Sequence, residues 1–325
     1  MQYIIESRFE PGYSRLFNVN DREVSMVNDS GRTNFFQLFR VYWLIPIIFT
    51  YALGVSLVHY LGGNLDVINL VLGIFLCLFM SGMRYLLNAF FDHPDSSFST
   101  LNRDDKTWEV LKRVKRNLLL QYSLLVLTGG AALTAILIAR EGLSPAGLLI
   151  LGLALLGNFF SASPPLRMDR SGYGDLVEGI VTVNLVPGLA VSLQKMNVPI
   201  LLLQLTIPLL LIYLAVKIEF AFRDYGFDIM HARKSLLTRI SWQKGVILHN
   251  LLILGAFVLV GVFLLLGLPW SLTWPVLLAL PLGVHQVWQM LRIANGQKPG
   301  WKLLLWMGLG LVLMMAYLIQ VPLWS

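Results

Sequence analysis

Two short stretches of the chain carry acidic residues at a spacing that suits metal binding. The first holds Asn88 and Asp92, closely followed by Asp95, and the second holds Asp224 and Asp228. On a helix, side chains four residues apart lie on one face, about 5 to 6 Å apart at Cβ. Oxygen donors at this spacing can converge on Mg²⁺, which proteins often bind through one or two carboxylates together with substrate phosphates. The spacing therefore predicts a magnesium site built from both stretches.

Basic side chains lie close to both acidic stretches in the sequence. Arginine and lysine beside a bound metal ion stabilise the negative charge that develops on a leaving diphosphate. The pattern predicts ionisation of an allylic diphosphate, with Asp92 and Asp228 as the catalytic carboxylates and apolar helices that shield the carbocation from water. The residues assigned to the diphosphate are Arg84, Arg103, Arg167, Arg223 and Lys234.

The elements that must position these residues are apolar helices. Hydrophobic residues make up 56% of the 325 residues and charged residues only 13%. Apolar stretches of about 20 residues, long enough to cross a bilayer, recur from end to end. We therefore expect an all-α, polytopic membrane protein, and the single cysteine, Cys77, leaves no disulfide framework. The predicted spans are 38–60, 66–91, 117–139, 144–161, 175–194, 199–221, 246–268, 273–291 and 302–323.

The loops between these spans differ in charge. Arginine and lysine cluster before the first span and in every second loop, whereas the other loops carry only Arg140 and Lys195. By the positive-inside rule the basic loops face the cytoplasm, so both acidic stretches lie on the cytoplasmic side of the cell (inner or plasma) membrane. We expect residues 1–36 to be a polar cytoplasmic segment and residues 37–325 the membrane domain. The net charge of +7 reflects this topology. The sequence contains no soluble module in which basic and aromatic residues alternate, so we do not expect nucleic-acid binding.

Three stretches carry a resemblance to a known family. "LLNAFFD" with "HPD", then "FFSASPPLRMDRSGYGDLVEGI", then "RDYGFDIMHARKSL" resemble the UbiA superfamily of intramembrane prenyltransferases, near its menaquinone-type branch. The resemblance implies nine transmembrane helices around a central cavity, Mg²⁺, and transfer of a polyprenyl group from a polyprenyl diphosphate to an aromatic or other lipophilic acceptor. It also implies that the metal and diphosphate ligands are Asn88, Asp92, Asp224 and Asp228, with Arg233 or Lys234 as the basic residue after the second motif.

The chain departs from the family pattern at several positions. Ala89 stands where the family usually has an acidic residue, and Asp95 lies one place early. Phe160 stands where a tyrosine commonly precedes the serine, here Ser161. We place the acceptor near the loop between spans four and five, with Ser161 and Asp175 as its candidate contacts.

Several residues also have a structural interpretation. Asp175 and Glu178 could cap the fifth span as acids at a helix N-terminus. Arg84 either extends to the interface or faces the cavity. Lys217 and Glu219 could lie at the interface.

Other function classes fit less well or stay open. A terpene cyclase of the same superfamily, which needs no acceptor, stays open. A transporter is disfavoured because the carboxylates crowd one membrane face instead of the midplane.

Overall fold

The computed structural model describes residues 43–97, 99, 106–230 and 234–325, and within these residues the chain is helical, without strands. The predicted segment 1–36 and the candidate ligands Arg103 and Arg233 lie outside the described residues. The elements are α2 (Leu44–Tyr60), α3 (Val67–Phe91), α4 (Lys106–Lys112), α5 (Arg116–Ala139), α6 (Pro145–Ala162), α7 (Met168–Ser171), α8 (Gly174–Ile180), a π-helical turn η4 (Val181–Leu185), α9 (Val186–Leu193), α10 (Ile200–Met230), α11 (Leu236–Ile240), α12 (Trp242–Leu265), α13 (Trp270–Leu277), α14 (Leu280–Ala294), α15 (Trp301–Gln320) and a 3-10 turn (Val321–Leu323).

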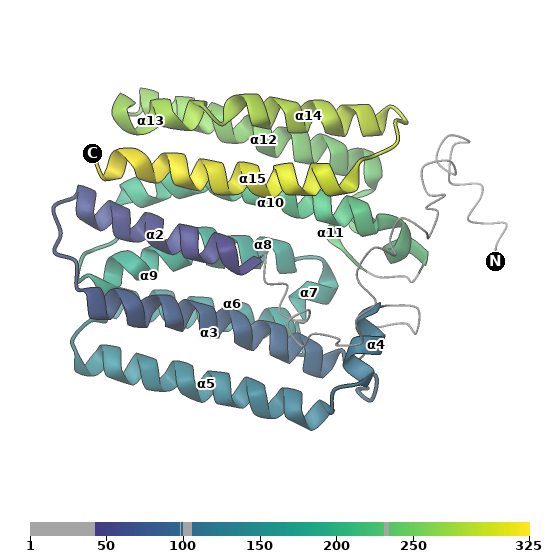
Figure 1. Cartoon of the computed structure of the whole chain (residues 1–325), viewed down its shortest axis with the longest axis horizontal. Coiled ribbons are helices and arrows are strands. Elements are labelled where there is room, and N and C mark those ends of the chain that lie inside the picture. The colour runs from purple at the N-terminus through teal and green to yellow at the C-terminus, as the bar shows by residue number, and fades with distance from the viewer. Residues whose placement is uncertain (1–42, 98, 100–105, 231–233) are drawn as a thin grey trace.

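Each predicted span overlaps one of these helices or consecutive helices, although residues 38–42 of the first span lie outside the described residues. Within the described residues, seven helical units are long and apolar enough to cross a membrane, or eight if α13 and α14, which meet at a 41° bend, form one span. The shorter apolar helix α2 has 17 residues. The long helices lie side by side, and successive ones along the chain alternate in direction (Figure 1). The chain is thus an all-α protein of the polytopic membrane type.

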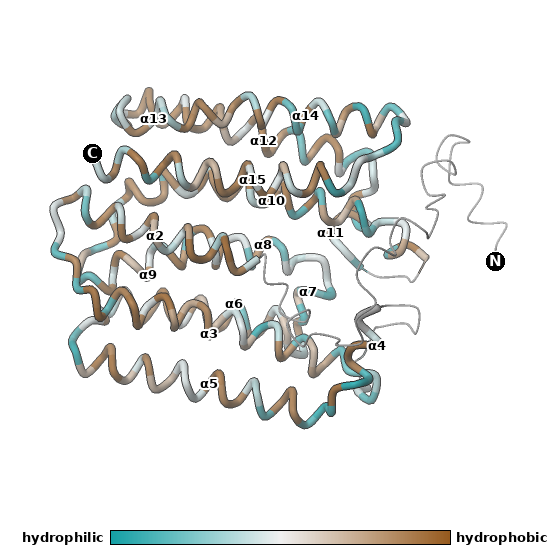
Figure 2. The backbone as a smooth tube through the Cα atoms, viewed as in Figure 1, coloured by the Kyte–Doolittle hydropathy of each residue, from teal (hydrophilic) through white to brown (hydrophobic). Residues whose placement is uncertain are grey.

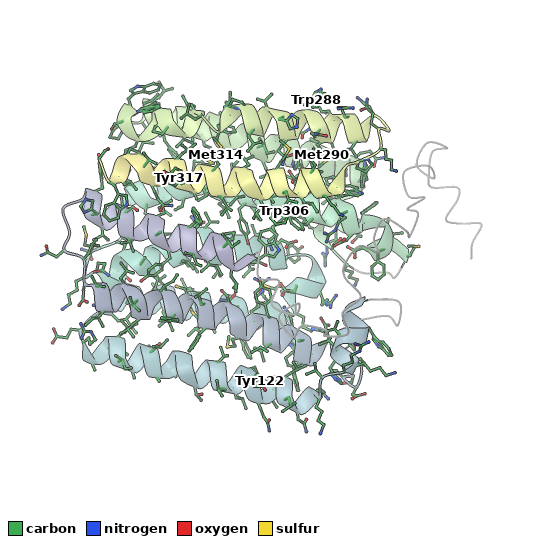
Figure 3. All side chains as sticks on the ribbon, viewed as in Figure 1. Tyr122, Trp288, Met290, Trp306, Met314 and Tyr317 are labelled. Atoms are coloured by element: carbon green, nitrogen blue, oxygen red, sulfur yellow. The ribbon has the colours of Figure 1, made fainter. Side chains whose placement is uncertain are left out.

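The packing of the helices forms one continuous bundle. α2 packs on α9, α3 on α6, α10 on α15 and α12 on α14. The outermost helices in Figure 1 are α5, which packs mainly on α3, and α13 and α14 at the opposite edge. Tyr122 on α5 and Trp288 on α14 are 45% and 48% exposed and lie on these outer helices (Figure 3). Large apolar side chains on the outside are what a surrounding lipid phase favours.

The end of the bundle away from the two acidic stretches contains local polar contacts at the start of α3. The Asp66 carboxylate caps α3 by accepting hydrogen bonds from the backbone N–H groups of Ile68 and Asn69. The hydrogen bond from Asn69 holds the pKa of the Asp66 carboxyl below its usual range, and the neighbouring Arg140 acts in the same direction. These contacts fix where α3 begins.

The opposite end collects the polar elements. The C-terminal ends of α3 and α10 and the short helices α4, α7 and α11 all lie at this end (Figure 1). Hydrophilic residues, coloured teal in Figure 2, are frequent at this end, whereas the long helices are mostly hydrophobic along their length. α10 has 31 residues, which at 1.5 Å per residue is about 46 Å. Because the hydrocarbon core is about 30 Å thick, α10 is longer than a crossing requires.

Candidate active site

The first acidic stretch ends α3 in a buried ion-pair cluster. Asp92 is the C-cap of α3, and its backbone N–H donates to the Asn88 carbonyl at 2.9 Å. The Asp92 carboxylate accepts a hydrogen bond from Arg167 Nη2 at 2.6 Å on one oxygen and from Arg170 on the other. Arg167 adopts a left-handed backbone (φ 39°) immediately before α7. Two guanidinium groups therefore enclose a carboxylate that is only 8% exposed.

Arg84 and Asn88 meet a carboxylate that sequence reasoning did not single out. Arg84 donates to both oxygens of Asp169, from Nε at 3.2 Å and from Nη2 at 2.5 Å, and the Asn88 amide donates to the same carboxylate. The Arg84 side chain is 6% exposed. Arg84 therefore faces the interior of the bundle instead of extending to the interface. Asp169 lies on α7, a four-residue helix within a polar loop, where nothing in the pattern marks it as a partner of Arg84; its side chain is 18% exposed.

The cluster continues through Glu178 to α10. The Glu178 carboxylate accepts hydrogen bonds from Lys217 Nζ at 2.5 Å and from the Tyr213 hydroxyl at 2.9 Å, and it lies 3.1 Å from Arg84 Nη2. Lys217 Nζ also lies 3.5 Å from the centroid of the Trp43 ring, a cation–π contact. Lys217 is therefore part of the buried cluster and does not lie at the interface, and Glu219, which is 0% exposed, does not lie there either.

We call this set the mouth cluster; it joins α2, α3, α7, α8 and α10 at one end of the bundle. Four carboxylates face four cations within it, so their formal charges balance. Because an unpaired charge buried away from water is costly, each member depends on its partners. The members are the acids Asp92, Asp169, Asp175 and Glu178, the bases Arg84, Arg167, Arg170 and Lys217, and the polar or aromatic Asn88, Tyr213 and Trp43.

The two candidate acceptor contacts occupy different environments. Asp175 lies in the first turn of α8, 3.7 Å from Lys217 Nζ, and its side chain is 41% exposed. The N-cap of α8 is Tyr173, which makes no side-chain cap bond, so Asp175 is an ion-pair member and not the cap. Ser161 is fully buried, and its hydroxyl donates to the Gly157 carbonyl at 2.7 Å.

The second acidic stretch lies on the last turns of α10. Asp224 is 49% exposed and pairs with its neighbour Arg223, which donates from Nε at 2.8 Å and from Nη2 at 3.1 Å. Asp228 is buried. Lys217, Asp224 and Asp228 are spaced by seven and four residues, so they share one face of α10. Lys234 follows this helix and is exposed.

The opposite face of α10 holds a second buried ionisable pair. Glu219 and His249 are both 0% exposed, and their Oε1 and Nε2 atoms are 2.9 Å apart. Glu219 Oε2 has no hydrogen-bond partner among the described residues. This oxygen lies against Gly308 of α15, where a Cβ atom would come within 2.2 Å of it. The pair lies between α10, α12 and α15, and so is separate from the mouth cluster.

The donor chemistry of both acidic stretches suits a hard cation. Asn88, Asp92, Asp224 and Asp228 offer oxygen, which Mg²⁺ prefers. Among the described residues, no three His, Cys, Asp or Glu side chains come together as a metal site, and the first stretch bonds instead to arginines and Asp169. Asp95 points outward with its side chain 80% exposed, 3.5 Å from His93 Nδ1.

Comparison with known proteins identifies the fold. No protein-family model matches the sequence, and no curated protein sequence matches it. Among solved structures, the chain is similar to a digeranylgeranylglyceryl phosphate synthase, with a TM-score of 0.62 and 16% identity over 89% of this chain and 97% of that chain.

Two further solved structures agree. A UbiA homologue from Archaeoglobus fulgidus bound to GPP and Mg²⁺ gives a TM-score of 0.57 at 16% identity, covering 87% of this chain and 100% of that chain. An apo UbiA homologue from Aeropyrum pernix K1 gives 0.55 at 14% identity, covering 86% and 96%. The chain therefore has the UbiA fold.

Proposed function

We propose that the protein is an intramembrane prenyltransferase that moves a polyprenyl group from an allylic diphosphate to an aromatic or other lipophilic acceptor. The observation that carries this proposal is the mouth cluster, where four basic side chains are held at the end of an apolar bundle beside the motif-bearing ends of α3 and α10. Buried ionisable groups at membrane depth usually mark functional sites. The UbiA fold and the solved homologue with GPP and Mg²⁺ support the same reading.

The arginines of the mouth cluster would bind the diphosphate. Arg167 and Arg170 now hold the two oxygens of Asp92, and a guanidinium group can pair with phosphate oxygens as it does with a carboxylate. The diphosphate would therefore compete with Asp92 for these two arginines. Arg84, held between Asp169 and Glu178, supplies a third positive charge from within the bundle. Arg223 and Lys234 would contribute from the α10 side.

Magnesium completes the proposed site. Asn88, Asp92, Asp224 and Asp228 would hold the ion, and Asp95 would contribute least because its side chain points outward. When bound, Mg²⁺ would neutralise part of the charge on the diphosphate and make it a better leaving group. The protein's own side chains would hold the diphosphate in place, and the apolar walls of the bundle would exclude water from the allylic cation.

The acceptor side of the proposal rests on the loop that carries α7 and α8. Asp175 is the partly exposed carboxylate of this region and is available to orient a polar group of the acceptor, whereas the hydroxyl of Ser161 is already bonded to Gly157. We place this end of the bundle on the cytoplasmic side of the cell membrane because the basic residues gather there. A quinone-type aromatic acceptor is the class we favour.

Product analysis tests the proposal. Purified protein in nanodiscs, supplied with Mg²⁺ and geranyl, farnesyl or geranylgeranyl diphosphate, should form a prenylated product when an aromatic acceptor is added. Asp228→Ala should lower this rate by orders of magnitude while the protein still folds. A cyclised hydrocarbon or terpene alcohol formed from the diphosphate alone would contradict transfer and favour a cyclase. Full activity of Asp228→Ala would contradict the proposed site.

A further inference from the structure

Three basic side chains gather where α4 ends and α5 begins. Lys112 is the last residue of α4, Lys115 is the N-cap of α5 and Arg116 is its first residue; we call these three residues the basic corner. Lys112 and Lys115 are exposed. No carboxylate that the structure describes forms an ion pair with any of the three. The basic corner therefore presents positive charge that the mouth cluster does not use.

Aromatic rings hold two of these cations in place. Lys112 Nζ lies 4.9 Å from the centroid of the Trp108 ring, and the guanidinium carbon of Arg116 lies 4.4 Å from that of the Phe90 ring on α3. The Arg116 Nε is buried and has no hydrogen-bond partner among the described residues. A guanidinium group can stack on a ring and still donate its outer N–H groups to a phosphate. The basic corner therefore suits a ligand that carries a phosphate.

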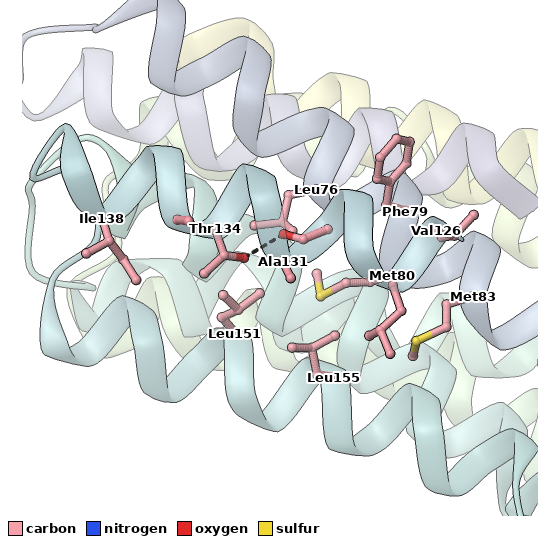
Figure 4. Close-up of a pocket in the computed structure, with 13 residues that line it drawn as sticks. Leu76, Phe79, Met80, Met83, Val126, Ala131, Thr134, Ile138, Leu151 and Leu155 are labelled. Carbon is pink, nitrogen blue, oxygen red and sulfur yellow. Dashed lines mark hydrogen bonds between the residues drawn. The ribbon is translucent and has the colours of Figure 1, made fainter. Parts of the chain in front are cut away.

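An apolar pocket of about 330 Å³ lies further along α5, between α3, α5 and α6 (Figure 4). Its one polar side chain, Thr134, donates its hydroxyl to the Gly130 carbonyl at 2.8 Å (Figure 4). Leu127 and Ile138 line the pocket and are also about half exposed, so the pocket is open toward the surrounding lipid. A pocket without free polar groups at membrane depth suits a hydrocarbon chain.

Two helix faces connect the basic corner with this pocket. On α5, Thr134 lies about five full turns after Arg116 at 3.6 residues per turn, so both residues are on one face. On α3, Phe90, Met83 and Phe79 are spaced by seven and four residues and so form one row along the helix. Met83, Phe79 and Thr134 all line the pocket. The faces that meet at the contact between Arg116 and Phe90 therefore meet again at the pocket.

The separation of the basic corner and the pocket matches the length of a lipid. From Arg116 to Leu127, at the start of the pocket, the distance along α5 is about 16 Å at 1.5 Å per residue. One leaflet contributes half of the hydrocarbon core of about 30 Å, which is about 15 Å. Leu124 is 50% exposed and lies between the two sites on the outer helix α5. A chain whose headgroup lies at Arg116 therefore reaches the near end of the pocket, where Met83 and Val126 lie (Figure 4).

We propose that the basic corner and the pocket together bind one anionic phospholipid of the bilayer, with its phosphate at Lys115 and Arg116 and one acyl chain between α5 and α6. This inference does not depend on the proposed function. The positive charge of the basic corner favours an anionic headgroup over a zwitterionic one. The acyl chain gains little affinity by entering the pocket, because the bilayer is as apolar as the pocket. The headgroup therefore gives the site its selectivity, and the pocket fixes where the chain lies.

Native mass spectrometry of the purified protein tests the headgroup contacts. The protein in detergent, titrated with phosphatidylglycerol or phosphatidylcholine, should bind phosphatidylglycerol more tightly. Lys115→Gln combined with Arg116→Gln should lower the affinity for phosphatidylglycerol about twentyfold, since each cation near a membrane surface contributes about fivefold. The matched control combines Lys298→Gln with Lys302→Gln, which removes the same charge from exposed positions next to α14 and α15. An equal loss of affinity in both double variants would show that only net charge attracts the lipid, and would overturn the inference.

Photocrosslinking tests where the acyl chain lies, and it needs no substitution. Phosphatidylglycerol with a diazirine near the end of one acyl chain, in phosphatidylcholine nanodiscs, should label peptides of α5 and α6. Excess phosphatidylglycerol should suppress the label, whereas excess phosphatidylcholine or inorganic phosphate should not. Label confined to other helices would overturn the pocket assignment. Suppression by inorganic phosphate as strong as by phosphatidylglycerol would identify a site for free phosphate and overturn the lipid assignment.

A filled pocket supplies the matched comparison for the same label. Ala131→Phe places a ring in the pocket, whereas Ala132→Phe adds the same ring to a neighbouring exposed position that does not line it. We expect Ala131→Phe to lower the label on α6 by about fivefold, because the ring occupies the space that the chain would fill. Ala132→Phe should leave the label within about twofold of the unsubstituted protein. Equal label on α6 in the two variants would overturn the inference.

Discussion

Two carboxylates of the acidic stretches, Asp92 in the first and Asp224 in the second, occupy opposite kinds of environment. Asp92, at the end of α3, is 8% exposed and has a guanidinium on each carboxylate oxygen. Asp224, on the last turns of α10, is 49% exposed and pairs with the adjacent residue Arg223. Removing one partner of a buried ion pair is costly, about 3 to 5 kcal/mol, whereas an exposed pair is worth about 0 to 1 kcal/mol. A carboxylate is thus part of the protein's stability at Asp92 and nearly independent of it at Asp224, whereas Asp228 is buried like Asp92.

This difference separates the two consequences of substituting an acidic residue. In the first stretch and its partners, a lost charge should disturb folding and activity together. At the exposed Asp224 of the second stretch, a lost charge should disturb activity alone. Measuring both quantities for residues of each region therefore tests whether the contrast between the regions is real.

The largest effect is expected on activity at Asp224. Asp224→Ala should lower the turnover of a prenyl diphosphate by orders of magnitude, because it removes a proposed magnesium ligand. Its unfolding free energy in detergent should stay within about 1 kcal/mol of the unsubstituted protein, since only an exposed pair is lost. Parallel assays of turnover and denaturant unfolding check this prediction. Strong destabilisation by Asp224→Ala would erase the contrast with α3.

The next effect is expected on stability at Glu178. Glu178→Gln keeps the shape of the side chain and leaves Lys217 and Arg84 without a buried carboxylate that both now contact. We expect destabilisation of about 3 kcal/mol. The matched control is Glu141→Gln, because that carboxylate is 90% exposed and lies 4.0 Å from Lys195; this variant should change stability by less than about 0.5 kcal/mol. Equal unfolding midpoints for the two variants would show that the mouth cluster does not hold the bundle together.

The smallest effect is expected at Asp95. This residue follows the first stretch but does not join the mouth cluster, and its side chain is 80% exposed. Asp95→Ala should change stability by less than about 0.5 kcal/mol and turnover by only a few-fold. A loss of activity as large as that of Asp224→Ala would make Asp95 a full ligand and place the first metal-binding stretch one turn further along the chain.

The sequence predicted the helices better than the contacts between them. Long apolar stretches and charged loops place the spans and bring the ends of α3 and α10 to one end of the bundle, because alternation of direction follows from the count of crossings. The spacing of Asn88 and Asp92 marks one face of a helix, but it does not say which side chain lies opposite. That partner, Asp169, comes from α7, whose position depends on tertiary packing.

Other residues of the mouth cluster were beyond the reach of sequence patterns for a similar reason. Tyr213 and Trp43 lie within or before apolar spans, where an aromatic residue is ordinary, and only the fold brings them to Glu178 and Lys217. Glu219 and His249 are thirty residues apart and meet because α10 packs on α12. A hint was available in the sequence, since a charged residue within a span is rare and usually has a partner inside the protein.

Release of inorganic diphosphate from farnesyl diphosphate tests the central claim most directly. Purified protein in nanodiscs, supplied with Mg²⁺ and an aromatic acceptor, should release diphosphate. A chelator should stop the release, and excess Mg²⁺ should restore it. Asp228→Ala should release none above background, while Asp95→Ala releases it at a rate within a few-fold of the unsubstituted protein. Release that continues in excess chelator, or equal release by Asp228→Ala, would contradict a magnesium-diphosphate site at the ends of α3 and α10.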